Sequence, residues 1–214
     1  MQSVTRIVSG GQTGADRAAL DWAIANNVPH GGWCPKGRKS EDGPIAAQYG
    51  LQETPSASYL QRTEWNVRDS DGTAIFTLSS KLTGGSKRTA EFAAKHQKPW
   101  IHISEADGPA VGTKLAQFVS VNGIKILNVA GTRGSKEPGV GELVLQSLSG
   151  LKRATGPHPV EMLAMMGGPM SGEELDLASV PLKPYWQDVA VNSIIGCGLA
   201  KTREEAIKLL DEEI

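Results

Sequence analysis

The sequence predicts an α/β fold in which a doubly wound, mainly parallel sheet carries helices on both faces. Two observations lead to this prediction. Short runs rich in β-branched residues alternate with helical patterns from residue 4 to residue 148, and such alternation is typical of right-handed crossovers in a parallel sheet. Glycine-rich loops also follow three of these runs, and in open parallel sheets ligands bind at the carboxyl edge where such loops lie.

Four strands and four helices are expected in this alternation. The β-branched runs predict strands over Val4–Ser9, Thr73–Leu78, Trp100–Ser104 and Ile124–Val129. Apolar residues at helical spacing predict helices over Ala15–Asn26, Ser86–His96, Val111–Val121 and Gly139–Leu148. The segment between the first predicted helix and the second predicted strand, Gly32–Asp71, is irregular and rich in glycine, proline and charged residues. One further helix is expected within it, over Ser56–Val67. A long irregular segment of this kind in a compact domain is often functional.

A change of composition divides the chain near residues 151–159. This stretch, LKRATGPHP, holds two prolines and a glycine, which favour a linker. Residues 1–154 carry 18 Lys and Arg against 13 Asp and Glu, whereas residues 155–214 carry 4 against 10. We therefore expect a ligand-binding domain over 1–154 and an acidic helical extension over 155–214. Capping boxes beginning at Ser171 and Thr202 predict two helix starts there, and Tyr185–Ile195 predicts another helix.

The composition gives no support to several function classes. No run of about 18 apolar residues is present, so no membrane span is expected. The first residues lack the basic and apolar regions of a signal peptide, which predicts a cytoplasmic protein. The small positive excess of residues 1–154 does not indicate nucleic-acid binding. Two cysteines, and four histidines without metal-site spacing, predict no metal bound by protein side chains.

Glycine is over-represented, with 25 of the 214 residues. Many of the glycines gather in three loops, Ser9–Gly14, Thr83–Thr89 and Ala130–Ser135, which share one edge of the predicted sheet. The first two loops lead into helices, whose free N–H groups and partial positive charge attract anions. None of the loops fits G-x-x-x-x-G-K-[ST] or G-x-G-x-x-G, the usual nucleotide fingerprints.

Basic side chains crowd the same loops and predict a site for phosphate or another oxyanion. Arginine can grip such a group through two donors, and glycine lets the backbone approach it closely. The alternative for each cation is a solvated surface charge, and for each loop a tight βα turn. Nine of the 22 cations, Lys136 among them, lie in or beside the loops and the irregular segment. The predicted ligand-binding residues are Gly10, Gly11, Thr13, Gly14, Lys36, Arg38, Gly84, Gly85, Ser86, Lys87, Arg88, Thr89, Gly131, Thr132, Arg133 and Ser135.

Two other side chains allow more than one interpretation. Asp16 stands in the first turn of a predicted helix, where a carboxylate either stabilises the helix end or binds a ligand. Cys34 is followed by Lys36, Arg38 and Lys39. Nearby cations would lower the pKa of its thiol and permit metal or sulfur chemistry, whereas the alternative is a buried, small apolar residue.

Three stretches together resemble the molybdenum carrier protein family. They are IVSGGQTGADRAALDWAIANNVPHGGWCPKGRKSEDGPI, TPSASYLQRTEWNVRDSDGTAIF and LTGGSKRTAEFA, and the resemblance runs from about Val4 to Leu148. It implies a Rossmann-like protein that binds and protects the molybdenum cofactor. The glycine loops would hold the cofactor's phosphate, Arg and Lys would neutralise its phosphate and oxo groups, and Trp33 or Trp65 could stack on its pterin. The cofactor's own sulfurs hold the metal.

The same region more distantly resembles the lysine-decarboxylase-like phosphoribohydrolases, which cleave nucleoside monophosphates to base and ribose phosphate. That family has an Arg some residues before an Asp that opens a strand, then a glycine loop ending in Glu, and Arg62, Asp71 and Glu91 match this pattern. The resemblance implies that Arg62 and Glu91 are catalytic if the protein is an enzyme. The sequence departs from the family where Lys87 and Arg88 replace a Gly-Thr pair.

These observations favour a binding protein over an enzyme. We expect a carrier for the molybdenum cofactor, or for a related phosphorylated anion, without turnover. The alternatives are a nucleoside-monophosphate phosphoribohydrolase and a nucleotide-ligand sensor whose output is the extension over residues 155–214. Because related folds commonly self-associate, a homo-oligomer is also expected.

Overall fold

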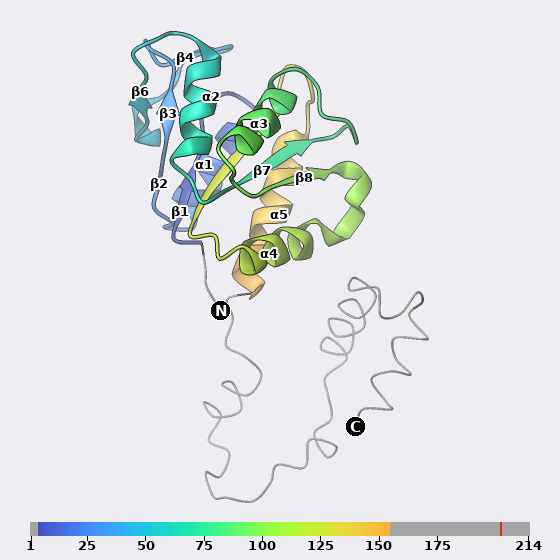
Figure 1. Ribbon diagram of the computed structural model, residues 1–214. Coiled ribbons are helices and arrows are strands. Elements are labelled where there is room, and N and C mark those ends of the chain that lie inside the picture. Colours follow the sequence, from blue (N-terminus) through green and yellow to red (C-terminus); the bar gives the residue numbers. More distant parts are fainter. Residues whose placement is uncertain (1–3, 155–201, 203–214) are drawn as a thin grey trace, which may run out of the picture. The chain divides into compact units, whose positions relative to one another are not determined.

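A five-stranded parallel sheet forms the centre of the domain over residues 4–154 (Figure 1). The computed structural model describes residues 4–154 and 202. The strand order is β2-β1-β9-β7-β8. The strands are β1 (Arg6–Val8), β2 (His30–Gly31), β7 (Gly72–Thr77), β8 (Trp100–Ser104) and β9 (Ile126–Gly131). The predicted doubly wound α/β fold is confirmed, and β2 is the strand of this central sheet that the sequence did not predict.

Helices cover both faces of this sheet. Helices α1 (Ala15–Ala25) and α4 (Val111–Val121) both pack on α5 (Val140–Ala154), and α2 (Tyr59–Arg68) packs on α3 (Gly84–Lys95). A short 3-10 segment, η2 (Glu105–Ala110), leads into α4. No helix in the described part of the chain is long and apolar enough to cross a bilayer.

The main core lies between the sheet and the α1, α4 and α5 helices. Parallel pairing places Ile7 opposite Leu127 and Phe76 opposite Gly131. The sheet residues Ile7, Phe76 and Leu127 are fully buried, as are Leu115 from α4 and Leu148 from α5. Burying such side chains is the main favourable contribution to folding.

The chain reverses its direction of winding next to β9. From β1 the chain crosses through α1 to β2, which is the strand at one edge of the sheet. From β7 it crosses through α3 to β8, which is the strand at the opposite edge. Strand β9 fills the place between β1 and β7. In open α/β sheets, ligands bind outside the carboxyl ends of the strands at such a topological switch point.

The irregular segment builds a small layer of its own. Strands β3 (Trp33–Cys34) and β6 (Gln52–Glu53) pair in parallel, β4 (Lys39–Ser40) and β5 (Gly43–Pro44) form a hairpin, and η1 (Ala47–Tyr49) lies between β5 and β6. Its apolar residues form a second buried cluster with α1, made of Leu20, Cys34, Ile45, Tyr49 and Leu51.

Three helices differ in extent from the sequence prediction. Helix α2 begins at Tyr59 because the Ser58 hydroxyl caps it by accepting a hydrogen bond from Leu60 N–H at 3.3 Å. Helix α3 begins at Gly84, and α5 continues to Ala154, into the stretch that was predicted to be a linker. Apart from Thr202, the predicted extension over residues 155–214 and its helices lie outside the described residues.

Candidate functional site

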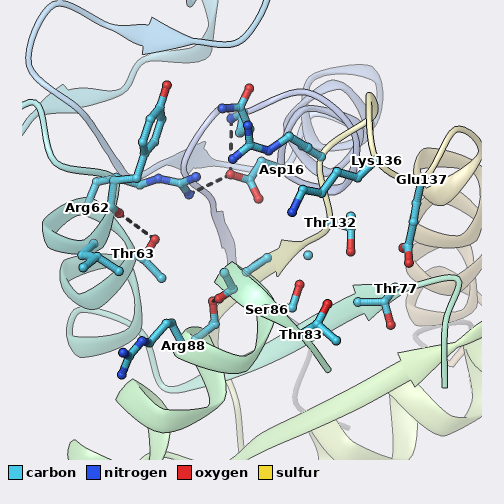
Figure 2. A pocket seen from close by; sticks show the side chains of 18 of the residues that line it. Asp16, Arg62, Thr63, Thr77, Thr83, Ser86, Arg88, Thr132, Lys136 and Glu137 are labelled. Carbon is cyan, nitrogen blue, oxygen red and sulfur yellow. Dashed lines mark hydrogen bonds and ion pairs between the residues drawn. The ribbon is translucent and has the colours of Figure 1, made fainter. Parts of the chain in front are cut away.

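A cavity of about 220 Å³ lies at the switch point, where β1, β9 and β7 end (Figure 2). The β1–α1 loop, helix α2, the first turns of α3 and the β9–α5 loop form its walls. Five cationic side chains and two carboxylates are among the lining groups, so its field favours an anion. These charged side chains are Arg62, Lys81, Arg88, Arg133, Lys136, Asp16 and Glu137.

The first turn of α3 presents unused backbone donors to the cavity. Thr83 is the N-cap residue, but its side chain accepts no hydrogen bond from the helix. No described residue accepts a hydrogen bond from the N–H groups of Gly85 or Ser86, as expected where a helix begins without a cap. Nothing lies within 4 Å of the position that a Cβ on Gly85 would take. This helix end therefore has both the donors and the space to bind an anion.

Lys136 faces this helix end from the β9–α5 loop (Figure 2). Its Nζ lies 4.0 Å from the position that a Cβ on Gly84 would take. The side chain forms no ion pair within the described part of the chain. The neighbouring Glu137 carboxylate accepts hydrogen bonds from Leu78 N–H at 2.7 Å and Ser79 N–H at 3.4 Å, and so fixes the β7–α3 loop. The Lys136 ammonium is therefore available to bind an anionic ligand.

The first glycine loop packs against the protein itself. At the N-terminus of α1, Ala15 N–H donates to Thr132 O at 3.2 Å. Gly14 has φ of +76°, and a Cβ there would lie 2.5 Å from Gly134 N. Glycine is required at this position for two loops to meet. The predicted ligand residues of this loop do not line the cavity; they are Gly10, Gly11, Thr13 and Gly14.

A buried ion pair joins the first loop to α2. Arg62 Nη1 donates to Asp16 Oδ2 at 2.8 Å, and the side chains are 12% and 4% exposed. Gln12 N–H also donates to Asp16 Oδ2, at 3.3 Å. Burial raises the pKa of Asp16, while the Arg62 guanidinium acts in the opposite direction. A Cβ on Gly10 would lie 1.8 Å from Arg62 Nη1, so this glycine leaves the space that the guanidinium occupies.

Beside the cavity, one carboxylate gathers the hydroxyl donors of two glycine loops. Glu41, at the tip of the β4–β5 hairpin, accepts hydrogen bonds from the Thr13 hydroxyl, from Ser135 N–H at 3.2 Å and from the Ser135 hydroxyl at 2.6 Å. Arg133 Nη1 lies 3.6 Å from Glu41 Oε2. The Ser135 and Thr13 hydrogen bonds lower the pKa of Glu41. The next residue, Asp42, forms an ion pair with Arg17 of α1.

The structure brings about half of the predicted ligand residues to the cavity. Those that line it are Gly85, Ser86, Arg88, Thr89, Gly131, Thr132 and Arg133. Lys36 and Lys87 are exposed and do not line it. Arg38 donates to the backbone carbonyls of Ile45, Ala46 and Leu51 at 2.7, 2.7 and 3.0 Å. Its guanidinium therefore holds the irregular segment together.

Only one of the two residues predicted to be catalytic in an enzyme lines the cavity. Arg62 lines the cavity, whereas Glu91 does not. Glu91 accepts a hydrogen bond from Arg88 Nη1 at 2.7 Å, and both side chains are exposed.

Cys34 is fully buried in the second cluster, and burial raises the pKa of its thiol. The structure therefore supports the second interpretation of Cys34, a buried, small apolar residue. Trp33 and Trp65 pack edge to face with ring centroids 4.7 Å apart, and Trp33 Nε1 donates to Asp69 at 2.7 Å. Neither tryptophan lines the cavity.

Several lining residues were absent from the predicted set of ligand residues. Gln12 lies inside the first glycine loop, and Lys136 was one of the cations noted beside the third. Thr77 and Glu137 carried no local signal, because the crossovers alone bring the end of β7 next to the β9–α5 loop. Within residues 4–154 and 202, no three His, Cys, Asp or Glu side chains gather closely enough to hold a metal ion.

Comparison with known proteins agrees with this architecture. Residues 7–151 match the model of the circularly permutated YpsA SLOG family. A crystal structure of a protein named as a putative molybdenum carrier, from Syntrophus aciditrophicus SB, is 42% identical with a TM-score of 0.67, and the match covers 70% of this chain and 96% of that chain. No protein with curated annotation matches. The resemblance to molybdenum carrier proteins is confirmed, and the chain belongs to the circularly permutated YpsA SLOG family.

Proposed function

We propose that this protein is a carrier that binds a small phosphorylated ligand in the switch-point cavity, without turnover, and that this ligand is the molybdenum cofactor. The observation that carries the proposal is the pairing of Lys136 with the uncapped N-terminus of α3 across the cavity. Free N–H groups at a helix N-terminus and a lysine ammonium are the donors that bind phosphate in many proteins.

The donors present suit a phosphate better than they suit a bare metal ion. The Ser86 and Thr132 hydroxyls line the cavity and form no hydrogen bond within the described part of the chain. Arg133 and Arg88 add cationic groups at its rim. Because the molybdenum cofactor holds its metal through its own sulfurs, a carrier for it needs no metal ligands of its own. The name of the similar crystal structure, a putative molybdenum carrier, supports a ligand that contains molybdenum.

The enzymatic alternative requires Arg62 and Glu91 to act on one ligand. Arg62 Nη1 is bonded to Asp16, and Glu91 is bonded to Arg88 outside the cavity. These contacts favour the carrier over a phosphoribohydrolase. We further propose a cytoplasmic protein that self-associates and binds neither nucleic acid nor membrane. Sedimentation with and without DNA or lipid vesicles would test the self-association and the binding, and fractionation of cells would test the location.

Anaerobic titration of the full chain with molybdenum cofactor tests the proposal, with guanosine 5′-monophosphate as the parallel substrate probe. We expect saturable binding of about one cofactor per chain and no release of free guanine. Lys136→Met should weaken cofactor binding by about 10-fold, in keeping with about 1.5 kcal/mol for a charge-assisted hydrogen bond. Release of guanine without cofactor binding would contradict the carrier proposal and would show that the protein is a phosphoribohydrolase.

Lys125→Met is the matched control for this variant. Lys125 also is an exposed lysine, but it precedes β9 and so lies at the opposite edge of the sheet from the cavity. This variant removes the same charge and should bind the cofactor as the unmodified protein does.

A further inference from the structure

Three polar atoms around the Asp16–Arg62 ion pair lack hydrogen-bond partners among the described residues. Asp16 Oδ2 accepts from Arg62 and from Gln12 N–H, whereas Asp16 Oδ1 accepts from none of them. Gln12 Nε2 and Arg62 Nε are buried donors without a partner. Buried polar groups are nearly always paired. Because Gln12 Nε2 and Arg62 Nε are shut off from solvent, Asp16 Oδ1 is the unpaired atom that a ligand in the cavity can reach.

Asp16 is only 3% exposed, and its carboxylate points into the cavity (Figure 2). A carboxylate in a site for anions would repel the ligand if its charge were not compensated. The Arg62 guanidinium at 2.8 Å supplies that compensation. With its negative charge compensated by Arg62, Asp16 can still accept a hydrogen bond from a ligand through Oδ1.

The cavity thus differs in chemistry from one end to the other. The end at α3 and Lys136 offers donors and positive charge, whereas the end at Asp16 offers an acceptor, Oδ1. Helix α2 adds an aromatic ring and an aliphatic side chain to the wall, Tyr59 and Leu60. Such surfaces suit a flat ring better than a sugar alone.

We propose that Asp16 determines the specificity of the site by accepting a hydrogen bond from a ring N–H of a phosphorylated heterocycle. The ring edge that matches carries an N–H, because the unpaired atom at this end of the cavity, Asp16 Oδ1, is an acceptor. The phosphate of the same ligand lies at Lys136 and α3. This inference rests on the proposed function, because the ligand whose ring contacts Asp16 is the same ligand whose phosphate binds at Lys136 and α3.

Two nucleotides that differ only at this edge test the inference in the unmodified full chain. Inosine 5′-monophosphate has the ring N–H and carbonyl, and purine riboside 5′-monophosphate has neither. Calorimetric titration should show the inosine compound binding about 10- to 100-fold more tightly, the range expected for a hydrogen bond to a charged group. Equal affinity of the two compounds would overturn the inference.

Asp16→Asn provides the matching test in the protein. The amide has the shape of the carboxylate, and its oxygen can keep the Arg62 hydrogen bond while its NH₂ group faces the cavity. The preference for the inosine compound should then disappear, while affinity for inorganic phosphate is kept or increased. Retention of the preference in a folded variant would contradict the inference. Glu105→Gln, which removes an exposed carboxylate that does not line the cavity, should keep the preference.

The same titrations separate this inference from the proposed function. If inorganic phosphate and ribose 5-phosphate bind and Lys136→Met weakens both, but the two nucleotides bind equally, the inference about Asp16 fails alone. If none of these phosphates binds to the unmodified protein, the proposed anion site fails, and the inference fails with it. If Asp16→Asn does not fold, the comparison of the two nucleotides on the unmodified chain decides the matter.

Discussion

Glu41 Oε2 accepts a hydrogen bond from the Ser135 hydroxyl at 2.6 Å, and this contact joins the β4–β5 hairpin to the loop that follows β9. Glu41 Oε1 accepts from the Thr13 hydroxyl, which itself accepts from Gly134 N–H at 3.1 Å. One carboxylate therefore links the irregular segment to two of the three glycine loops. These loops form one side of the cavity, so the hairpin helps to fix its shape.

The Glu41 contacts predict a loss of stability in acid. Hydrogen bonds from Ser135 and Thr13 hold the pKa of Glu41 below its ordinary value of 4.5. The stabilisation is therefore fully present above pH 4.5 and is lost as the pH falls through 4.5 towards the folded-state pKa. In Glu41→Gln, the melting temperature should fall less steeply over this range than in the unmodified protein. Thermal unfolding between pH 6 and pH 3 measures the difference.

Part of the acid dependence should survive this substitution. The Arg17 guanidinium lowers the pKa of Asp42, and Lys95 lowers that of Glu64, so these groups also favour the folded state above their ordinary pKa values. Identical pH profiles for Glu41→Gln and the unmodified protein would contradict the role given to Glu41.

Gly131 should tolerate no larger side chain. A Cβ there would lie 2.2 Å from Phe76 O and 2.7 Å from the Ala15 Cβ, within the closest packing of β9 against β7 and α1. Gly131→Ala should destabilise the protein by about 1–3 kcal/mol through overpacking, as measured by denaturant unfolding. Gly85→Ala is the control, since no atom lies within 4 Å of its Cβ position. It should leave stability unchanged or raise it by about 0.4–1 kcal/mol.

Removal of Arg62 alone should be costly. Arg62→Met leaves the buried Asp16 carboxylate without its partner, for which about 3–5 kcal/mol is typical. The double variant Arg62→Met with Asp16→Asn removes both charges, so it should be more stable than Arg62→Met alone. Unfolding free energies of the two single variants and the double variant form the cycle that measures this coupling. Additive losses would mean that the ion pair contributes nothing beyond its separate side chains.

The Cys34 thiol should be unreactive in the folded protein. It is fully buried, and burial raises its pKa, so little thiolate is available to react. In a Cys197→Ser background, Ellman's reagent should label no thiol in native buffer and one in denaturant. Rapid labelling of the native protein would instead support the sulfur chemistry that the neighbouring cations suggested.

The sheet was predictable because its long strands carry a strong local signal. The β-branched runs over β7, β8 and β9 and the apolar spacing of α1, α3 and α4 need no tertiary information. Strand β2 was missed because two residues, His30 and Gly31, show no alternation. The two-residue strands of the irregular segment are likewise too short to show an alternating pattern. Arg38 holds that segment together by donating to backbone carbonyls, and such contacts cannot be inferred from residue spacing.

The candidate site was only partly predictable, because local sequence does not show which helix end stays open. The loops before α1 and α3 look alike, since both are rich in glycine and both begin a helix. In the structure, Thr132 O accepts from Ala15 N–H at the first helix, whereas no described residue accepts from Ser86 N–H at the second. Sequence patterns placed ligand residues in both loops. The packing of the β9–α5 loop against the first decides between them.

The most direct test of the central claim is a phosphate titration of nitrogen-15-labelled protein, followed through its backbone amide resonances. The proposed site predicts saturable shifts centred on Gly85 and Ser86, weakened about 10-fold in Lys136→Met and unchanged in Lys125→Met. Shifts centred on Gln12–Gly14, with Gly85 and Ser86 unaffected, would contradict the account and place the anion at α1.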